Sequence, residues 1–138
     1  AEQTKAIAKY LDDAIRAALR QGQVIDITTT GRRSGEPRRL EIVFHVVDGR
    51  IYISGMPRAD RERAWLLNLR ANPRLTFHLK NGPVADLPAT ARVIEDPAER
   101  HEVLAKIAQV WRRDPIEMEA YSPLIEVTID GLEVGRAA

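Results

Sequence analysis

The chain has no cysteine, only 5% aromatic residues and no long hydrophobic run. Without cysteine there can be no disulfide, thiolate catalysis, iron–sulfur cluster or cysteine-ligated zinc. No apolar stretch approaches the roughly 20 residues that span a bilayer, and the N-terminus lacks the apolar core of a signal peptide. We therefore expect a cytoplasmic protein that does not insert stably into a membrane.

Charges of the two signs nearly cancel, since 21 Lys and Arg residues face 20 Asp and Glu residues. The chain as a whole is not steered toward nucleic acid or anionic membranes, so an anion site must come from local clustering. A length of 138 residues fits one domain, residues 1–138, with one hydrophobic core. We expect no nucleic-acid partner.

Helical spacing of apolar residues predicts three helices. The first is amphipathic and covers residues 1–22, with Gly22 as its C-terminal stop. Its charges are mixed rather than basic, which favours packing on the protein over binding to a membrane surface. The second helix starts at Asp60, a candidate N-cap, and ends before Pro73, and the third opens at Asp96.

Alternating and β-branched residues predict about six strands between these helices. They are expected at residues 24–30, 39–47, 50–54, 75–79, 84–95 and 125–129. Pro88 falls within the fifth of them and should lie at an edge or a bulge. The pattern predicts an α+β fold in which a mostly antiparallel sheet curls into a small barrel with three peripheral helices.

The most distinctive segment is residues 28–39, here called the arginine loop, which joins the first two expected strands and carries four arginines. Its glycines let the backbone approach a ligand closely. Backbone N–H groups, hydroxyl groups and arginine guanidinium groups can then bind anionic oxygens, so a phosphorylated small molecule is the expected ligand. A solvated basic hairpin is the alternative. The segment is neither a P-loop nor a dinucleotide fingerprint, because a strand rather than a helix follows it.

Few side chains suggest acid–base or metal chemistry. His45, His78 and His101 do not fall at metal-ligand spacing, so we expect packed or solvated histidines and no metal site. Ser34 lacks the Gly-x-Ser-x-Gly setting of a hydrolase nucleophile. Redox chemistry carried by a bound cofactor needs no such machinery from the protein. Trp65 would then wall an aromatic ring system, the alternative being that it fills the core.

Residues 27–38 and 65–73, taken together, resemble the deazaflavin-dependent nitroreductase family. The likeness extends over roughly residues 24–130. It implies a split β-barrel, the fold shared with flavin-dependent pyridoxamine-phosphate oxidases, and an oxidoreductase that uses coenzyme F-420, a deazaflavin. That coenzyme would deliver a hydride to a small electrophilic acceptor such as a quinone, an enone or a nitroaromatic compound. Its polyanionic tail agrees with the independent interpretation of the arginine loop.

The resemblance also implies which residues form the site. The implied coenzyme-binding residues are Thr30, Arg32, Arg33, Ser34, Gly35, Arg38, Ser54, Gly55, Arg61 and Trp65. Those of the arginine loop would hold the phosphate and the tail, whereas Ser54 and Gly55 would face the deazaflavin. Tyr121 lies where the family places a lid over the substrate and is the candidate catalytic residue. A phenol there can donate a hydrogen bond to the acceptor oxygen as negative charge develops on it.

Two positions depart from the family pattern. Glu41 places a carboxylate where the family offers a proline near the ring, and Met56 lies in a segment without the lysine of the nitroimidazole-reducing members. A carboxylate beside an anionic coenzyme is unfavourable unless an arginine pairs with it. Two other functions therefore stay open: a flavin mononucleotide (FMN)-dependent oxidoreductase on the same barrel, and a non-catalytic module for a fatty acid or another small anion. A homodimer is also expected if an edge strand is left unpaired.

Overall fold

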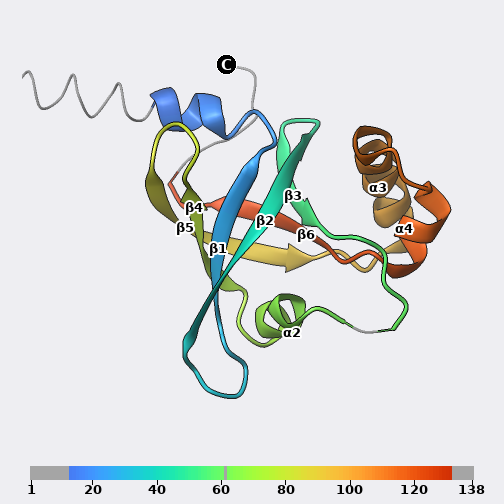
Figure 1. Cartoon of the computed structure of the whole chain (residues 1–138), viewed down its shortest axis with the longest axis horizontal. Helices are drawn as coiled ribbons and strands as arrows, with labels where there is room; N and C mark the ends of the chain where they lie inside the picture. Colours follow the sequence, from blue (N-terminus) through green and yellow to red (C-terminus); the bar gives the residue numbers. More distant parts are fainter. Residues whose placement is uncertain (1–12, 61, 132–138) are drawn as a thin grey trace, which may run out of the picture.

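Six antiparallel strands close into a barrel in the computed structural model, which describes residues 13–60 and 62–131 (Figure 1). The order around the barrel is β1-β2-β3-β6-β5-β4. The elements are β1 (Val24–Thr30), β2 (Pro37–Val47), β3 (Arg50–Ser54), α2 (Ala64–Ala71), β4 (Arg74–Leu79), β5 (Ala85–Val93), α3 (Pro97–Trp111), α4 (Pro115–Tyr121) and β6 (Leu124–Ile129). The predicted α+β barrel is confirmed.

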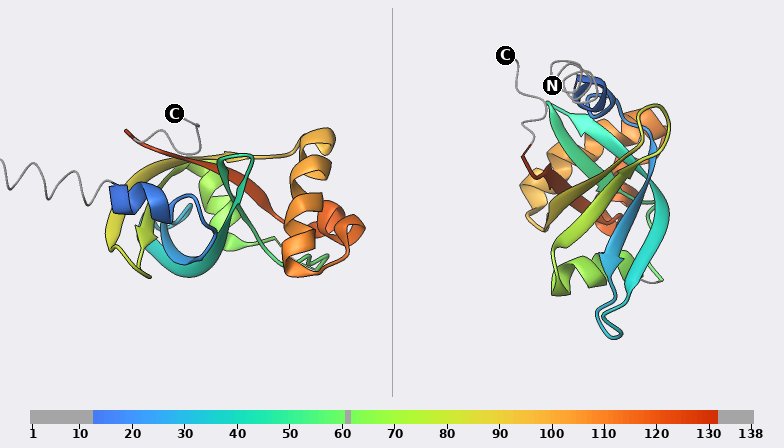
Figure 2. Two further views of the ribbon diagram at one scale, coloured as in Figure 1. Left: turned by 90° about the horizontal axis from the view of Figure 1, so that it is seen from above. Right: turned by 90° about the vertical axis from the view of Figure 1, so that its left-hand side faces the viewer.

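Side-chain alternation explains why these segments form strands with one face in the core. In β1 every second residue is buried, which places Ile25 and Ile27 inside the barrel with no exposed surface. Phe44 of β2 meets Phe77 of β4 edge-to-face, with ring centroids 5.1 Å apart. The helical segment over 13–18 leads to Leu19, which is fully buried in the same core. Figure 2 shows this segment, in blue, at the end of the barrel away from α2.

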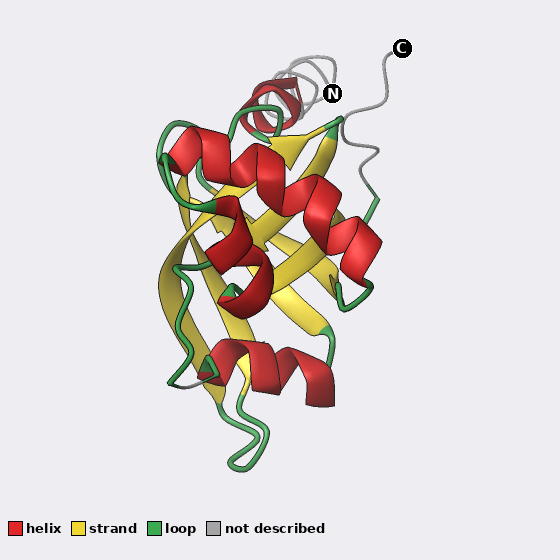
Figure 3. Cartoon of the chain, turned by 90° about the vertical axis from the view of Figure 1, so that its right-hand side faces the viewer, coloured by secondary structure: helices red, strands yellow, loops and turns green. Residues whose placement is uncertain are grey.

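A second apolar cluster joins α3 and α4 to the outside of the barrel (Figure 3). It contains Leu104 and Ile107 of α3, Met118 of α4 and Tyr52 of β3. The Asp96 carboxylate caps α3 by accepting a hydrogen bond from Glu99 N at 3.0 Å, and Pro97 follows at the first helical position. This layer fixes the connection from α4 to β6 against the barrel.

The helices differ from the prediction in two places. The second helix begins at Ala64, not at Asp60, because the Asp60 carboxylate pairs with Arg58 at 2.9 Å instead of capping. Helix α4 was not predicted, although Asp114 and Pro115 repeat the start signal of α3 and the Asp114 carboxylate accepts from Ile116 N at 2.9 Å. Residues 1–12 of the predicted first helix lie outside the described residues.

Closure of the barrel changes the expectation about edges. Each of the six described strands has a partner on both sides, so the unpaired edge strand that favoured a homodimer is not seen in them. Pro88 nevertheless lies at a local edge, because β6 pairs with β5 only from Ala89 onward. The Pro88 carbonyl accepts a hydrogen bond from Asp130 N at 2.9 Å just beyond the end of β6. On its other side Pro88 pairs with Thr76 of β4, so this proline lies inside the barrel sheet and not in an edge strand.

His45 of β2 gives the fold a measurable pH dependence. The His45 and Trp111 rings pack edge-to-face, with their centroids 4.7 Å apart. Burial lowers the pKa of His45, because the charged form loses hydration. Acid then protonates the unfolded chain first, so stability present above the usual pKa of about 6.5 is lost as the pH falls toward the folded pKa. We expect His45→Gln to lose less Tm than wild type between about pH 7.5 and 5.5, in thermal unfolding. His101→Gln is the control, and equal losses in wild type and His45→Gln would contradict the assignment.

Candidate functional site

A pocket of about 440 Å³ opens between the arginine loop and α2. We call it the arginine-loop pocket. It is lined by Thr29, Gly31, Arg32, Arg33, Ser34, Arg38, Arg39, Leu40, Ala64, Trp65 and Asn68. The structure thus brings five of the predicted coenzyme-binding residues together, four from the loop and Trp65 from the helix.

A tight turn at residues 31–36 fixes the conformation of the arginine loop. Gly31 N donates to the Glu36 carbonyl at 2.8 Å, and Gly35, with φ of +72°, donates to the Gly31 carbonyl at 2.9 Å. A Cβ on Gly31 would lie 2.6 Å from Ser34 Oγ, so any larger residue would displace that side chain. Ser34 Oγ in turn accepts hydrogen bonds from Glu36 N at 3.1 Å and from Arg38 Nη2 at 3.4 Å. The turn therefore holds the Arg38 guanidinium beside the Ser34 hydroxyl, and both residues line the pocket.

Three of the four arginines that line this pocket have no carboxylate partner in the described part of the chain. The guanidinium groups of Arg32, Arg33 and Arg38 make no ion pair with a carboxylate within residues 13–60 and 62–131. By contrast, Arg39 pairs with Asp26 at 3.0 Å and Arg74 pairs with Asp130 at 2.7 Å. Three arginines around one cavity, none paired with a described carboxylate, give this pocket a local excess of positive charge.

Asn68 of α2 ties the arginine loop to the helix, and the sequence analysis missed it. Its side chain is 5% exposed, accepts a hydrogen bond from Arg32 N at 3.1 Å and donates one to Thr29 Oγ1 at 3.1 Å. A buried amide with both ends satisfied holds its partners in place. The sequence shows only an asparagine one turn after Trp65 on the expected helix, and its two partners in the arginine loop are visible only in the structure.

We expect Asn68→Ala to loosen the loop and to lower both stability and coenzyme affinity. Removing the amide leaves Arg32 N and the Thr29 hydroxyl without their partner, a loss of about 1–3 kcal/mol in the free energy of unfolding. Urea unfolding and a coenzyme titration on the same variant measure the two effects. Asn81→Ala is the matched control, because Asn81 makes its hydrogen bond to the Val24 carbonyl away from the pocket. A variant with full stability and unchanged affinity would show that Asn68 does not anchor the loop.

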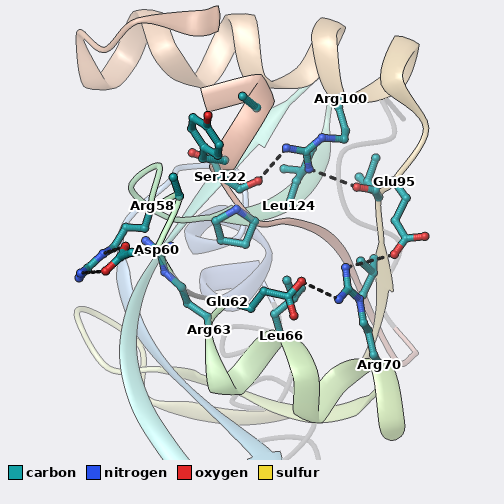
Figure 4. A pocket seen from close by; sticks show the side chains of 16 residues that line it. Arg58, Asp60, Glu62, Arg63, Leu66, Arg70, Glu95, Arg100, Ser122 and Leu124 are labelled. Carbon is teal, nitrogen blue, oxygen red and sulfur yellow. Dashed lines mark hydrogen bonds and ion pairs between the residues drawn. The ribbon is translucent and has the colours of Figure 1, made fainter. Parts of the chain in front are cut away.

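A second pocket of about 530 Å³ lies on the other face of α2 (Figure 4). We call it the lid pocket. Helix α2 contributes Leu66 and Arg70 to it, and the segment from α4 to β6 contributes Tyr121, Ser122 and Pro123. Tyr121, the predicted catalytic residue, is therefore at the lid pocket and is 50% exposed. The two pockets use opposite faces of one helix.

The other predicted site residues lie around these pockets without lining the first. Ser54 is 1% exposed and donates its hydroxyl to the Pro123 carbonyl at 2.6 Å, so its oxygen is already engaged. Gly55 lies beside Pro123, whose Cγ would be 3.2 Å from an added Cβ. Thr30 and Gly35 line a separate hollow with Arg74. Arg61 lies outside the described residues.

Glu41, the unfavourable carboxylate of the sequence analysis, is paired away from the arginine-loop pocket. The Lys80 ammonium binds Glu41 and, at 2.8 Å, Asp26, and these hydrogen bonds raise the pKa of Lys80. The neutralising cation is thus a lysine rather than the expected arginine. Leu40, not Glu41, lines the pocket, which removes the conflict with an anionic ligand.

The histidines are packed or exposed as predicted. His78 is 6% exposed and lies between Thr28 Oγ1 at 2.6 Å and Asp86 Oδ1 at 2.7 Å, whereas His101 is exposed and pairs with Glu119. Over the described ranges, no group of three or more His, Asp and Glu residues could hold a metal ion. No helix among the described residues is long and apolar enough to cross a membrane.

Solved structures share this barrel at low sequence identity. A protein from Listeria innocua, titled "Putative Pyridoxamine 5'-phosphate oxidase", matches with a TM-score of 0.65 and 18% identity over 90% of this chain and 97% of that chain. An F420-H2 dependent reductase (FDR-A) matches with a TM-score of 0.59 and 22% identity over 76% and 93% of the two chains. A structure described as a domain-swapped dimer matches with a TM-score of 0.58 and 22% identity over 92% and 95%. These likenesses establish the split β-barrel.

The chain is thus a split β-barrel with an arginine-lined cavity beside Trp65. A family model described as F420H(2)-dependent quinone reductase matches residues 2–125 of this chain. The protein belongs to this family and is a deazaflavin-dependent reductase with coenzyme F-420 as its cofactor. The family match favours coenzyme F-420 over FMN and over a non-catalytic binding module.

Proposed function

We propose that the arginine-loop pocket holds the anionic tail of coenzyme F-420 and that the acceptor enters through the lid pocket. The acceptor would be a quinone or another small electrophile, an enone or a nitroaromatic compound. The observation that carries this proposal is the set of three guanidinium groups without carboxylate partners around a cavity walled by Trp65. Bound coenzyme F-420 supplies the hydride.

The residues present fit such a coenzyme. The tail carries phosphate and carboxylate groups, which arginine forks and the Ser34 hydroxyl can bind together. Gly31 lets the Ser34 hydroxyl lie where it does, because a Cβ at this position would clash with Ser34 Oγ. Trp65, 7% exposed, lines the cavity and would wall it beside a flat aromatic group. The protein's part is therefore to bind, orient and exclude water.

Turnover tests the proposed function directly. Reduced coenzyme F-420 mixed with the protein and the naphthoquinone menadione should be reoxidised, and the returning absorbance of the oxidised deazaflavin measures the rate. An enzyme-free mixture is the control. Binding of the coenzyme without turnover of menadione, an enone or a nitroaromatic compound would contradict a reductase and would support a non-catalytic binding module.

Tyr121 is expected to stabilise charge on the acceptor oxygen. Tyr121→Phe keeps the ring and removes only the hydroxyl donor, so kcat should fall roughly tenfold with coenzyme affinity unchanged. Steady-state kinetics and a coenzyme titration on one preparation separate the two quantities. Tyr52→Phe is the matched control, because Tyr52 packs in the second apolar cluster and does not line the lid pocket. Unaltered kcat in Tyr121→Phe would leave catalysis to coenzyme positioning alone.

We also propose a homodimer, which is supported by the structural neighbour described as a domain-swapped dimer. Sedimentation velocity distinguishes a monomer of 15.5 kDa from a species of twice that mass. A single monomeric species across the concentration range used for kinetics would overturn the dimer.

A further inference from the structure

One buried hydroxyl in the lid pocket has no partner. Ser122 is 3% exposed and lines the pocket, and its Oγ makes no hydrogen bond to any residue that the structure describes. Buried hydroxyl groups are nearly always satisfied, because an unpaired one is unfavourable by the free energy of its lost hydration. The Ser122 Oγ itself has almost no exposed surface, so a ligand in the pocket reaches it only after the side chain turns about χ1, a change that breaks no hydrogen bond of this hydroxyl.

The backbone around Ser122 is held from two sides. Arg100 Nη2 donates to the carbonyls of Ser122 and Glu119, both at 2.8 Å, and Ser54 Oγ donates to the Pro123 carbonyl at 2.6 Å. Figure 4 shows the Arg100 guanidinium reaching across to Ser122. A donor on a fixed backbone is preorganised, because little conformational freedom is lost when a ligand binds.

The Arg100 guanidinium makes no ion pair with a carboxylate among the described residues. Its hydrogen bonds end on backbone carbonyls, those of Ile94, Met118, Glu119 and Ser122, and its Nε–H has no acceptor among the described residues. Desolvation lowers the pKa of Arg100, while the Glu119 carboxylate, which pairs with His101, acts on it from a distance.

Two other arginines of the lid pocket, Arg58 and Arg70, are paired with carboxylates, unlike Arg100. Arg58 pairs with Asp60 at 2.9 Å, and Arg70 lies between Glu62 and Glu95 at 3.2 Å from each (Figure 4). Apolar side chains of Leu66, Ile94 and Leu124 complete the wall and suit a flat hydrocarbon group. The pocket therefore combines apolar side chains, a hydroxyl without a described partner and the Arg100 guanidinium, which has no carboxylate partner among the described residues.

We propose that the lid pocket selects an acceptor that carries a carboxylate, with an unsaturated or aromatic body against Leu66 and Leu124. One carboxylate oxygen accepts the hydrogen bond of Ser122 Oγ–H beside the Arg100 guanidinium. This inference rests on the proposed function in placing the acceptor in the lid pocket, and it narrows the acceptor from any small electrophile to an unsaturated carboxylate.

Binding of a non-reducible probe tests the inference without coenzyme or turnover. Isothermal titration with 2-naphthoate, compared with 2-naphthylmethanol, isolates the carboxylate on one aromatic body. The naphthoate should bind at least tenfold more tightly than the alcohol, and Ser122→Ala should weaken the naphthoate roughly tenfold. Since the hydroxyl removed has no partner in the free protein, the Tm of Ser122→Ala should not fall.

Two control variants test whether 2-naphthoate binds in the lid pocket. Thr128→Ala removes an exposed hydroxyl on β6 and should leave naphthoate binding unchanged, as should Arg32→Ala in the other pocket. Equal affinity for the two probes, an unchanged Kd in Ser122→Ala, or loss of binding in Arg32→Ala would each overturn the inference. Failure to turn over any acceptor would contradict the proposed function instead. The titration would still decide whether the lid pocket prefers a carboxylate, because it needs neither coenzyme nor turnover.

Discussion

Replacing Trp65 with alanine is expected to lower the free energy of unfolding by roughly 3–5 kcal/mol and to weaken coenzyme binding as well. Trp65 is 7% exposed and belongs to the core cluster that fills the barrel. It also lines the arginine-loop pocket. The sequence analysis treated these roles as alternatives, whereas the structure assigns Trp65 a place in both.

Stability and affinity measured on the same Trp65→Ala protein separate the two roles. Urea unfolding gives the first, and a coenzyme titration well below the Tm gives the second. Trp111→Ala is the matched control, because Trp111 packs on the second cluster against His45 and should lose stability without losing affinity. Affinity within twofold of wild type in Trp65→Ala would remove its role as a pocket wall, and unchanged stability would remove its role in the core.

Arg32→Ala and Arg38→Ala are each expected to weaken coenzyme binding by about 1.5–3 kcal/mol, or roughly 10–150-fold. Neither guanidinium has a carboxylate partner in the described part of the chain, so removing it should take binding energy from the ligand rather than from the fold. Fluorescence titration at constant salt measures the loss, and the Tm should stay close to wild type.

Arg74→Ala serves as the control for the loop arginines. Arg74 is paired with Asp130 away from the arginine-loop pocket, so its removal should leave coenzyme affinity unchanged. If both loop variants bind the coenzyme within twofold of wild type, the arginine loop is a solvated hairpin and the anion site lies elsewhere.

The strands could be predicted from the sequence because their signal is local. Alternation along β1 marks its buried face, whereas β3 is a short apolar run buried from Ile51 to Ser54, and both strands have the predicted bounds, Val24–Thr30 and Arg50–Ser54. The start of α2 could not be predicted, because an acidic residue before a helix can pair with a neighbouring cation instead of capping. Asp60 pairs with Arg58, so the helix begins four residues later than expected.

The same distinction holds for the site. The arginine loop is contiguous in sequence, so its clustered charges can be recognised from the order of residues alone. Asn68 and Ser122 cannot be recognised in this way. The importance of Asn68 depends on its burial and on partners 36 or more residues away, and that of Ser122 depends on its burial without any described partner. Which arginines stay unpaired is likewise decided by the packing of the barrel.

The most direct test of the account is a titration of the protein with coenzyme F-420 and with FMN, side by side, at low and high salt. The account predicts that coenzyme F-420 binds at least tenfold more tightly than FMN, since its longer tail carries more negative charge for the arginine loop. It also predicts that the affinity falls with salt and is lost in the Arg32→Ala/Arg38→Ala double variant. Equal or tighter binding of FMN, or coenzyme F-420 affinity that neither salt nor the double variant changes, would contradict it.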